Sequence, residues 1–334
     1  MDLRCVGCNP HYYSVISDYF EKNDNAIEFL RAHGVLPRAV NCPHCDLPCK
    51  YREDRHTWYC GRWKKIAKTK RRKSCVFSIS DYSGTFLQGT HLAPYKVVLF
   101  VNHWLQKYWD HQTVTKCIGM SRPTSVDWRS FCSEVTQNWW LQNQNSIGGA
   151  GIIVEIDETL LVRRKYNRGR QVSHVWVFGG IERVSKKKFI VPLVDGDRSA
   201  DTLIPLIKKY IKPDSMIYSD KWAAYRNLKH LGYKHLSINH SENFVDPHDP
   251  QLHTQNIERL WRDLKEWIRR PGIRAEYLPQ YIARYLFITE NSNSPLHSFF
   301  VEAASLYPPQ GGVQRDQPSP VPVPLDEGTS SESE

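Results

Sequence analysis

Three acidic residues in the second half of the chain stand where carboxylates could hold divalent cations. Asp157 and Asp220 each end a short apolar run that is typical of a buried strand, and Glu258 flanks the apolar stripe of an amphipathic helix. An ionised carboxylate at such a strand end is costly unless it is exposed at a site or held by a cation. Each acid alone is more often a turn or surface residue. Together they could hold two cations that clamp the attacking and leaving oxygens of a phosphodiester displacement.

Four cysteines near the N-terminus have a spacing that suggests a structural zinc site. Cys42 and Cys45 would lie on one tight turn, and Cys60 and Cys75 would complete a tetrahedron. Fourteen residues separate Cys60 from Cys75, as though a loop had been inserted. Inert buried cysteines are the alternative to a metal site. Three nearby side chains are rival ligands: Cys49, His44 and His56. One more pair, Cys5 with Cys8, could bind a second zinc ion.

The segment between Cys60 and Cys75 is strongly basic. Residues 62–73 hold eight lysines or arginines and no acid, which predicts a solvated loop and suggests a nuclear-import signal or a phosphate-contacting arm. We expect Arg71 and Arg72 to contact DNA. The net charge of +10 favours a polyanionic partner, because lysines and arginines that neutralise phosphates release counterions.

The elements that would position these residues follow from the hydrophobic pattern. Residues 112–128 resemble a helix-turn-helix, in which Gly119 permits the turn, Ser121 caps the second helix and Pro123 lies in its first turn. A plain helical hairpin is the alternative. From residue 151 the pattern predicts an α/β fold with a mixed sheet covered by helices. We expect strands at 152–157, 172–178, 189–194 and 216–219, and helices at 202–211, 222–231 and 253–270.

We therefore expect a zinc-binding module at 1–88, a helical DNA-binding region at 89–148, a catalytic domain at 149–306 and a disordered tail at 307–334. The tail is rich in proline, serine and acids. No apolar run is long enough to span a bilayer, and no leader pattern opens the chain, so we expect an intracellular protein. A reducing compartment would keep the nine cysteines free for metal binding.

Several linked motifs resemble those of the DDE transposases of the Merlin superfamily and their bacterial insertion-sequence relatives with an ISXO-like domain. The motifs are Glu155-Ile156-Asp157-Glu158-Thr159, Tyr218-Ser219-Asp220-Lys221-Trp222, His253-Thr254-Gln255-Asn256-Ile257-Glu258 and Trp261-Arg262-Asp263-Leu264-Lys265. The resemblance implies a ribonuclease H-like core that uses two magnesium or manganese ions. It also implies a partner, double-stranded DNA, that is cut and pasted at terminal inverted repeats, and we expect a homodimer or higher homo-oligomer.

Carried over to this sequence, the resemblance gives Asp157 and Asp220 the first two acidic places. The third falls on Glu258 or Asn256, because relatives differ in using an acid or an asparagine, and we favour the carboxylate as the better ligand for a hard cation. Further basic residues are expected to bind DNA: His253, Lys265, Lys221 and Arg122.

The long basic insert and the acidic tail depart from the compact bacterial pattern and suggest a eukaryotic host and the nucleus. A catalytically silent DNA-binding regulator descended from a transposase is the main alternative. A nuclease or recombinase of the same fold is another.

Overall fold

The computed structural model describes residues 11–65, 72–162, 175–238, 253–268 and 275–310. These residues form two compact units. The first combines residues up to Ala26 with Leu92–Glu302, and the second combines Ile27–His91 with residues from Ala303 onward. The expected division into four segments stays a prediction, and nearly all of the expected tail lies outside the described residues.

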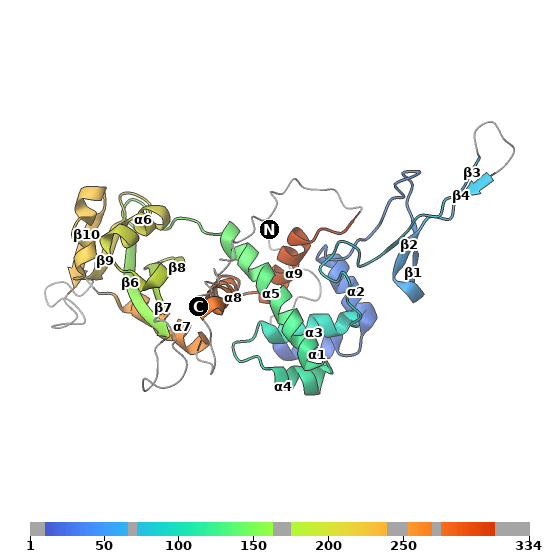
Figure 1. The fold of residues 1–334 in the computed structure, drawn as a ribbon, viewed down its shortest axis with the longest axis horizontal. Coiled ribbons are helices and arrows are strands. Elements are labelled where there is room, and N and C mark those ends of the chain that lie inside the picture. The colour runs from blue at the N-terminus through green and yellow to red at the C-terminus, as the bar shows by residue number, and fades with distance from the viewer. Residues whose placement is uncertain (1–10, 66–71, 163–174, 239–252, 269–274, 311–334) are drawn as a thin grey trace, which may run out of the picture. The chain divides into compact units, whose positions relative to one another are not determined.

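A five-stranded mixed sheet forms the centre of the first unit (Figure 1). Its strand order is β10-β9-β6-β7-β8. Strand β7 runs antiparallel to β6 and β8, whereas β9 runs parallel to β6 and β10. The strands are β6 (Ile153–Val162), β7 (Val175–Glu182), β8 (Lys188–Pro192), β9 (Met216–Asp220) and β10 (Lys234–Ile238). The predicted mixed α/β fold is confirmed.

The two faces of this sheet are covered by different helices. One face packs with α6 (Ala200–Tyr210) around a core that includes Val154 and Ile156 of β6. The other packs with α7 (Gln255–Ile268) and α8 (Leu278–Glu290), and Figure 1 shows α6 and α7 on opposite sides of the strands. Successive side chains of a strand point to opposite faces, so β6 presents Glu155 and Asp157 toward α7.

The other elements that the structure describes in the first unit are helices. The long helix α5 packs along α8, and the buried Arg284 guanidinium of α8 donates to the carbonyl oxygen of Trp104 at 2.7 Å. The helices are α1 (Tyr12–Tyr19), α3 (Pro94–Trp104), α4 (His111–Thr113), the π-helix η2 (Val114–Ile118) and α5 (Arg122–Gln142). Short 3-10 helices are η3 (Val194–Gly196), η4 (Ala223–Tyr225), η5 (Leu228–Leu231) and η6 (Ala275–Tyr277).

The predicted turn between two helices lies where the sequence placed it. Gly119 has φ 68°, a conformation that glycine adopts without strain. The Ser121 hydroxyl accepts a hydrogen bond from the Thr124 backbone N–H at 3.3 Å and caps α5, which has a proline in its first turn. The turn and the cap are thus present, and the helix-turn-helix and its reading of DNA stay predictions.

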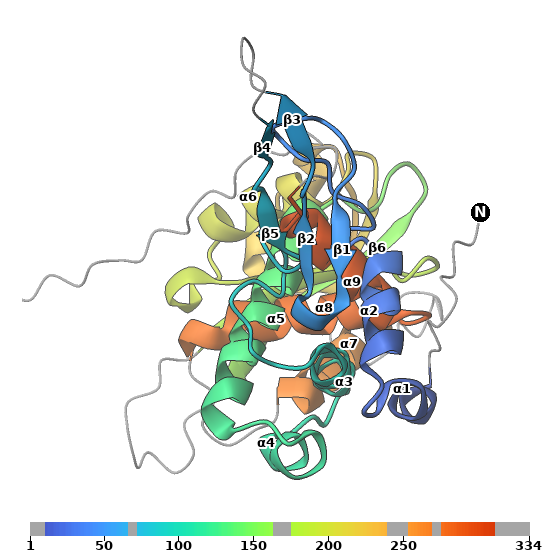
Figure 2. The same cartoon turned by 90° about the vertical axis from the view of Figure 1, so that its right-hand side faces the viewer.

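The second unit contains the cysteine-rich segment. Its three-stranded antiparallel sheet has the order β1-β2-β5, and a separate hairpin pairs β3 with β4. Figure 2 shows this hairpin extending away from the three-stranded sheet. The elements are α2 (Asn23–Ala32), β1 (Lys50–Arg52), η1 (Glu53–Arg55), β2 (Thr57–Tyr59), β3 (Trp63–Lys65), β4 (Arg72–Ser74), β5 (Ser78–Ser80) and α9 (Pro295–Leu306). α2 and α9 each extend across a boundary between the units.

One predicted helix is wrong. Residues 222–231 form the two 3-10 helices η4 and η5 rather than one α-helix. Tyr225 and Leu228 are both fully buried, and their spacing of three suits the 3-10 repeat. Asn227 between them leaves the helical region, with φ −92° and ψ 2°. Of the helices described, none has the length and hydropathy needed to cross a bilayer.

Candidate catalytic and metal-binding sites

Asp157 and Asp220 lie together on neighbouring strands. Parallel pairing aligns Glu155 of β6 with Tyr218 of β9, two residues before each aspartate, and the charge of Asp220 acts on Asp157. Burial, then the charges of Glu158 and Asp220, raises the pKa of Asp157 to about 7. A third carboxylate therefore joins the pair that the sequence pointed to.

Hydrogen bonds fix the orientation of both aspartates. The Trp261 indole N–H of α7 donates to Asp157 Oδ2 at 3.0 Å. The Trp222 backbone N–H donates to Asp220 Oδ1 at 3.0 Å. Both side chains are half-buried, so an oxygen of each can still meet a ligand from solvent.

Glu158 is the acid whose place the sequence did not reveal. It is buried and accepts a hydrogen bond from the Tyr225 hydroxyl. Burial raises the pKa of Glu158 to about 7. The Tyr225 hydrogen bond and the charge of Arg198 lower this pKa, whereas the charge of Asp220 raises it. Its adjacency to Asp157 in the sequence was the one available signal. The raised pKa values of Asp157 and Glu158 show that negative charge is concentrated here, which a divalent cation would offset.

Glu155 of β6 binds the N-terminus of α7 through hydrogen bonds. Its fully buried carboxylate accepts from the backbone N–H groups of Asn256 and Ile257 at 2.8 and 3.1 Å. Arg183 neutralises it at 2.9 Å. A carboxylate at a helix N-terminus satisfies free N–H groups and interacts favourably with the helix dipole. Sequence reasoning missed this role, although Glu155 shares a strand face with Asp157.

The two possible third ligands differ in their surroundings. The Asn256 amide is engaged at both ends, donating to Glu155 at 2.8 Å and accepting from Lys186 Nζ at 2.6 Å. Glu258 is exposed on α7, one turn before Trp261, and accepts a long hydrogen bond from the Thr254 hydroxyl at 3.4 Å.

The structure does not gather the three predicted acids around one point. Within the described part of the chain, no three acids have ligand oxygens within 4.8 Å of one another. The structure brings Asp157 and Asp220 together but does not bring Glu258 into one cluster with them.

The residues expected to bind DNA occupy different surroundings. His253 is half-buried, and its carbonyl oxygen accepts from Arg183 at 2.7 Å, so it belongs to the network around Glu155. Arg71 lies outside the described residues. The others are exposed, on or beside α7, β9, α5 and β4: Lys265, Lys221, Arg122 and Arg72.

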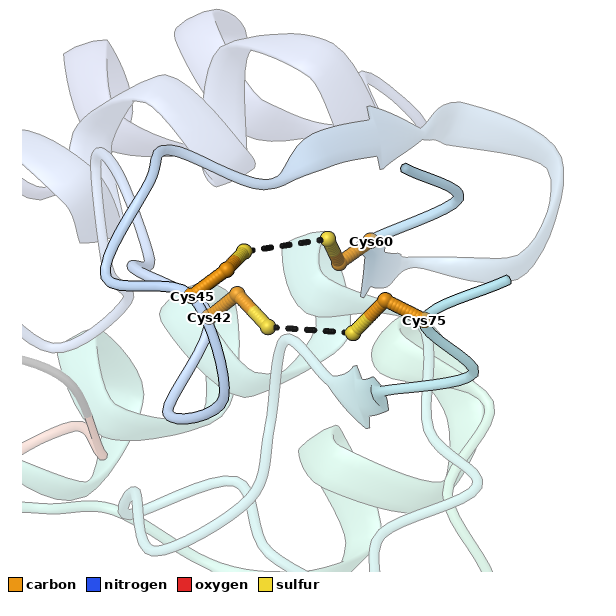
Figure 3. Close-up of side chains that lie close together, drawn as sticks. All are labelled: Cys42, Cys45, Cys60 and Cys75. Carbon is orange, nitrogen blue, oxygen red and sulfur yellow. Dashed lines mark hydrogen bonds between the residues drawn. The ribbon is translucent and has the colours of Figure 1, made fainter. Parts of the chain in front are cut away.

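The four predicted cysteine ligands converge in the second unit (Figure 3). Their sulfur atoms all lie within 4.8 Å of one another. Cys42 Sγ is 3.4 Å from Cys75 Sγ, and Cys45 Sγ is 3.6 Å from Cys60 Sγ. These distances are too long for disulfides and close to the ~3.8 Å sulfur separation of a tetrahedral zinc site with ~2.3 Å bonds.

The irregular spacing of the second cysteine pair is explained by the hairpin. Strands β3 and β4, which lie between the two cysteines, pair in antiparallel fashion, so the two ends of the fourteen-residue insert are adjacent. The Cys75 backbone N–H donates to the Arg62 carbonyl at 2.7 Å, which holds the two ends of the insert together. The described ends of the insert therefore keep Cys60 and Cys75 close together.

The rival ligands stay outside the four-cysteine cluster. The His44 ring packs edge-on against Phe77, and the His56 ring contacts the Tyr51 hydroxyl at 3.1 Å. Cys49 is not one of the clustered four, although burial and then its cysteine neighbours raise the pKa of its thiol. Cys5 and Cys8 lie outside the described residues.

Comparison with known proteins identifies the class to which this site and sheet belong. The ISXO2-like transposase domain matches residues 148–289. An uncharacterized transposase-like protein of Haemophilus influenzae is 32% identical over 98 residues, which are 29% of this chain and 76% of that protein. The chain belongs to the family of proteins with an ISXO2-like transposase domain.

Two further similarities are more distant. The male abnormal protein mab-31 of Caenorhabditis elegans is 26% identical over 175 residues, covering 48% of this chain and 40% of that protein. The catalytic core domain of BIV integrase matches 46% of this chain and 97% of its own at 15% identity, with a TM-score of 0.28.

Proposed function

We propose that this protein is a DDE-type transposase, which binds the terminal inverted repeats of a mobile element and performs metal-dependent strand cleavage and strand transfer. The observation that carries the proposal is the pairing of Asp157 with Asp220 in a domain of the ISXO2-like transposase family. The sheet order, with three antiparallel strands followed by two parallel ones, supports a ribonuclease H-like core.

In this proposal the carboxylates hold two magnesium or manganese ions. The donor set fits, because Asp157 and Asp220 offer carboxylate oxygens, and a cation would offset the charges of Asp220 and Glu158 that help to raise the pKa of Asp157. Bound ions would activate the attacking water or 3′-hydroxyl and stabilise the leaving oxygen. The role of the protein is to hold the carboxylates, and Trp261 keeps one oxygen of Asp157 turned toward α7.

Glu258 is proposed as the third ligand. It projects from α7 one turn before Trp261, which contacts Asp157, so a rotation of its exposed side chain can bring it toward the pair. A site with two ions about 4 Å apart also needs wider ligand spacing than a single ion does.

The second unit is proposed to hold structural zinc and to assist DNA binding. Cys42, Cys45, Cys60 and Cys75 offer the four thiolates that a closed zinc site uses. The basic insert at 62–73 and the helix pair around Gly119 would contact DNA, and the insert would direct the protein to the nucleus. Assembly into a dimer or higher oligomer would pair the two element ends.

The proposal is tested by cleavage of a labelled duplex that carries the inverted repeat flanking this gene. With magnesium or manganese, the wild-type protein should cut at the repeat end. Asp220→Asn should cut at least ~100-fold more slowly and still bind the duplex in a gel-shift assay. Asp214→Asn is the matched control, because this exposed aspartate lies just before β9 at φ 62°, which asparagine tolerates. If the wild-type protein shows no metal-dependent cutting, the proposal is refuted.

The similarity to mab-31 favours a second candidate function. That protein's name describes an abnormality of males and mentions no transposase, although it aligns over 48% of this chain. A catalytically silent DNA-binding regulator would bind the repeat duplex with unchanged affinity in Asp220→Asn and would show no cleavage in any variant.

A further inference from the structure

Arg198 is held between two tryptophan rings in the first unit. Its guanidinium carbon lies 3.9 Å from the ring centroid of Trp176 and 4.8 Å from that of Trp222. The Trp222 indole N–H donates to the Arg198 carbonyl oxygen at 3.0 Å, which ties the ring to the loop. Contact with aromatic faces restrains a long side chain that would otherwise be free to move.

This stacked arginine lies beside the proposed catalytic acids. Trp222 follows Asp220 by two residues, and its backbone N–H donates to that carboxylate at 3.0 Å. The same tryptophan therefore contacts the Asp220 carboxylate through its backbone and the Arg198 loop through its indole. Through Trp222, the Arg198 guanidinium is therefore held near the end of β9 that carries Asp220.

The guanidinium makes no close ion pair with a carboxylate among the described residues. In the parts of the chain that the structure describes, no carboxylate oxygen lies within 4 Å of its nitrogen atoms. The adjacent Asp197 carboxylate instead accepts from the Ser199 backbone N–H at 2.9 Å and from the Thr202 hydroxyl, at the start of α6. Stacking occupies the faces of a guanidinium and leaves its edge N–H donors available.

We propose that Arg198 binds a backbone phosphate of the DNA strand next to the phosphodiester that Asp157 and Asp220 act on. The inference rests on the proposed function. A planar guanidinium can donate two parallel hydrogen bonds to one phosphate. The carboxylates of the proposed site would repel the strand, and a fixed cation near them offsets that repulsion. Trp176 and Trp222 act as positioning residues that hold the guanidinium.

The first measurement is the salt dependence of binding to the labelled inverted-repeat duplex, without divalent cations. Arg198→Gln should weaken binding at low salt by roughly 10-fold and reduce the slope of log Kd against log salt by about 1, the loss of one phosphate contact. Arg198→Lys keeps the charge and should keep the slope. Lys208→Gln is the matched control, because this exposed residue lies near the opposite end of α6 and should change neither quantity.

The second measurement locates the phosphate by replacing one backbone phosphate at a time with a neutral methylphosphonate. Wild-type binding should fall sharply at a position next to the cut, and Arg198→Gln should show no further loss there. The inference would be overturned if, at every position, the methylphosphonate weakened DNA binding by Arg198→Gln as much as it weakened binding by the wild type. An unchanged salt slope in Arg198→Gln would also overturn it.

Failure of the inference is separable from failure of the proposed function. A wild-type protein that neither binds nor cuts the repeat duplex refutes the function and the inference together. A wild-type protein that cuts it, with Arg198→Gln cutting and binding equally well, refutes the inference alone. If Arg198→Gln fails to fold, judged by circular dichroism, Trp222→Phe takes its place, and methylphosphonate sensitivity at the same position should then be reduced.

Discussion

The ionisation of Asp157 makes the metal-free protein sensitive to pH. Burial, with the neighbouring acids, raises the pKa of Asp157 to about 7 in the folded protein, from 3.8. A raised carboxylate pKa means that ionisation opposes folding. This destabilisation is fully present above about pH 7 and is lost as the pH falls toward about 4.

Asp157→Asn should therefore stabilise the chelator-treated protein at pH 8. The expected gain in the free energy of unfolding is on the order of a few kcal/mol at pH 8 and close to zero at pH 4. Asparagine can still accept the Trp261 hydrogen bond, so that contact is retained. Urea unfolding at several pH values measures the difference, with Asp214→Asn as control. A gain that does not depend on pH would show that Asp157 does not titrate in this way.

Asn256 and Glu258 should respond in opposite ways to substitution. Asn256→Ala removes a hydrogen bond to the buried Glu155 carboxylate and should lower the unfolding free energy by roughly 1–3 kcal/mol. Glu258→Gln should leave stability unchanged and abolish cleavage, because Glu258 is exposed and is proposed as a metal ligand. Cleavage retained by Glu258→Gln and lost in a stable Asn256→Ala protein would assign the third ligand to Asn256.

At the scale of elements, the close contact of α7 with β7 sets the position of Asp157. A Cβ at Gly179 would lie 2.5 Å from the Trp261 ring and 2.8 Å from the Phe189 carbonyl oxygen. The backbone atom cannot move aside as a flexible side chain can. Only glycine therefore lets Trp261 approach β7 and reach Asp157.

Gly179→Ala should destabilise the first unit by roughly 1–3 kcal/mol, since overpacking forces α7 outward. It should also impair cleavage more than DNA binding, because Trp261 then loses its hold on Asp157. Gly61→Ala is the control, with its nearest contact at an ordinary 3.6 Å. Thermal unfolding and the cleavage assay measure the two effects, and a variant as stable and active as wild type would refute the packing argument.

The sequence predicted those elements whose signals are local. Apolar runs located the strands, and Ser121 with Gly119 located a cap and a turn that the structure contains. The roles of Glu155 and Glu158 could not be predicted, because they depend on partners 28 to 102 residues away in the chain. The 3-10 helices at 223–231 were mistaken for one α-helix because their apolar spacing also fits an α-helix.

At the scale of the whole molecule, the second unit has its own means of stabilisation. Its sheet has strands of only three residues, and such a small module commonly needs a metal ion. The four clustered thiolates could supply that need.

We expect about one zinc ion per chain, held by the cysteine cluster. Cys42→Ser should lose zinc and expose the second unit to proteolysis, because zinc binding is coupled to folding at such sites. Cys49→Ser is the matched control, since Cys49 lies near the cluster without belonging to it. Atomic absorption and limited proteolysis provide the readout. Full zinc content in Cys42→Ser, or loss of zinc in Cys49→Ser, would contradict the assignment.

The most direct test of the central claim is strand transfer. Purified protein is incubated with magnesium, supercoiled plasmid and a labelled duplex that ends in the inverted repeat with a free 3′-hydroxyl. The wild-type protein should join the labelled strand to the plasmid, and the chelator and Asp157→Asn should each remove that product while leaving duplex binding intact. Joining by Asp157→Asn at the wild-type rate, or no joining by a wild-type protein that binds the duplex, would contradict the account.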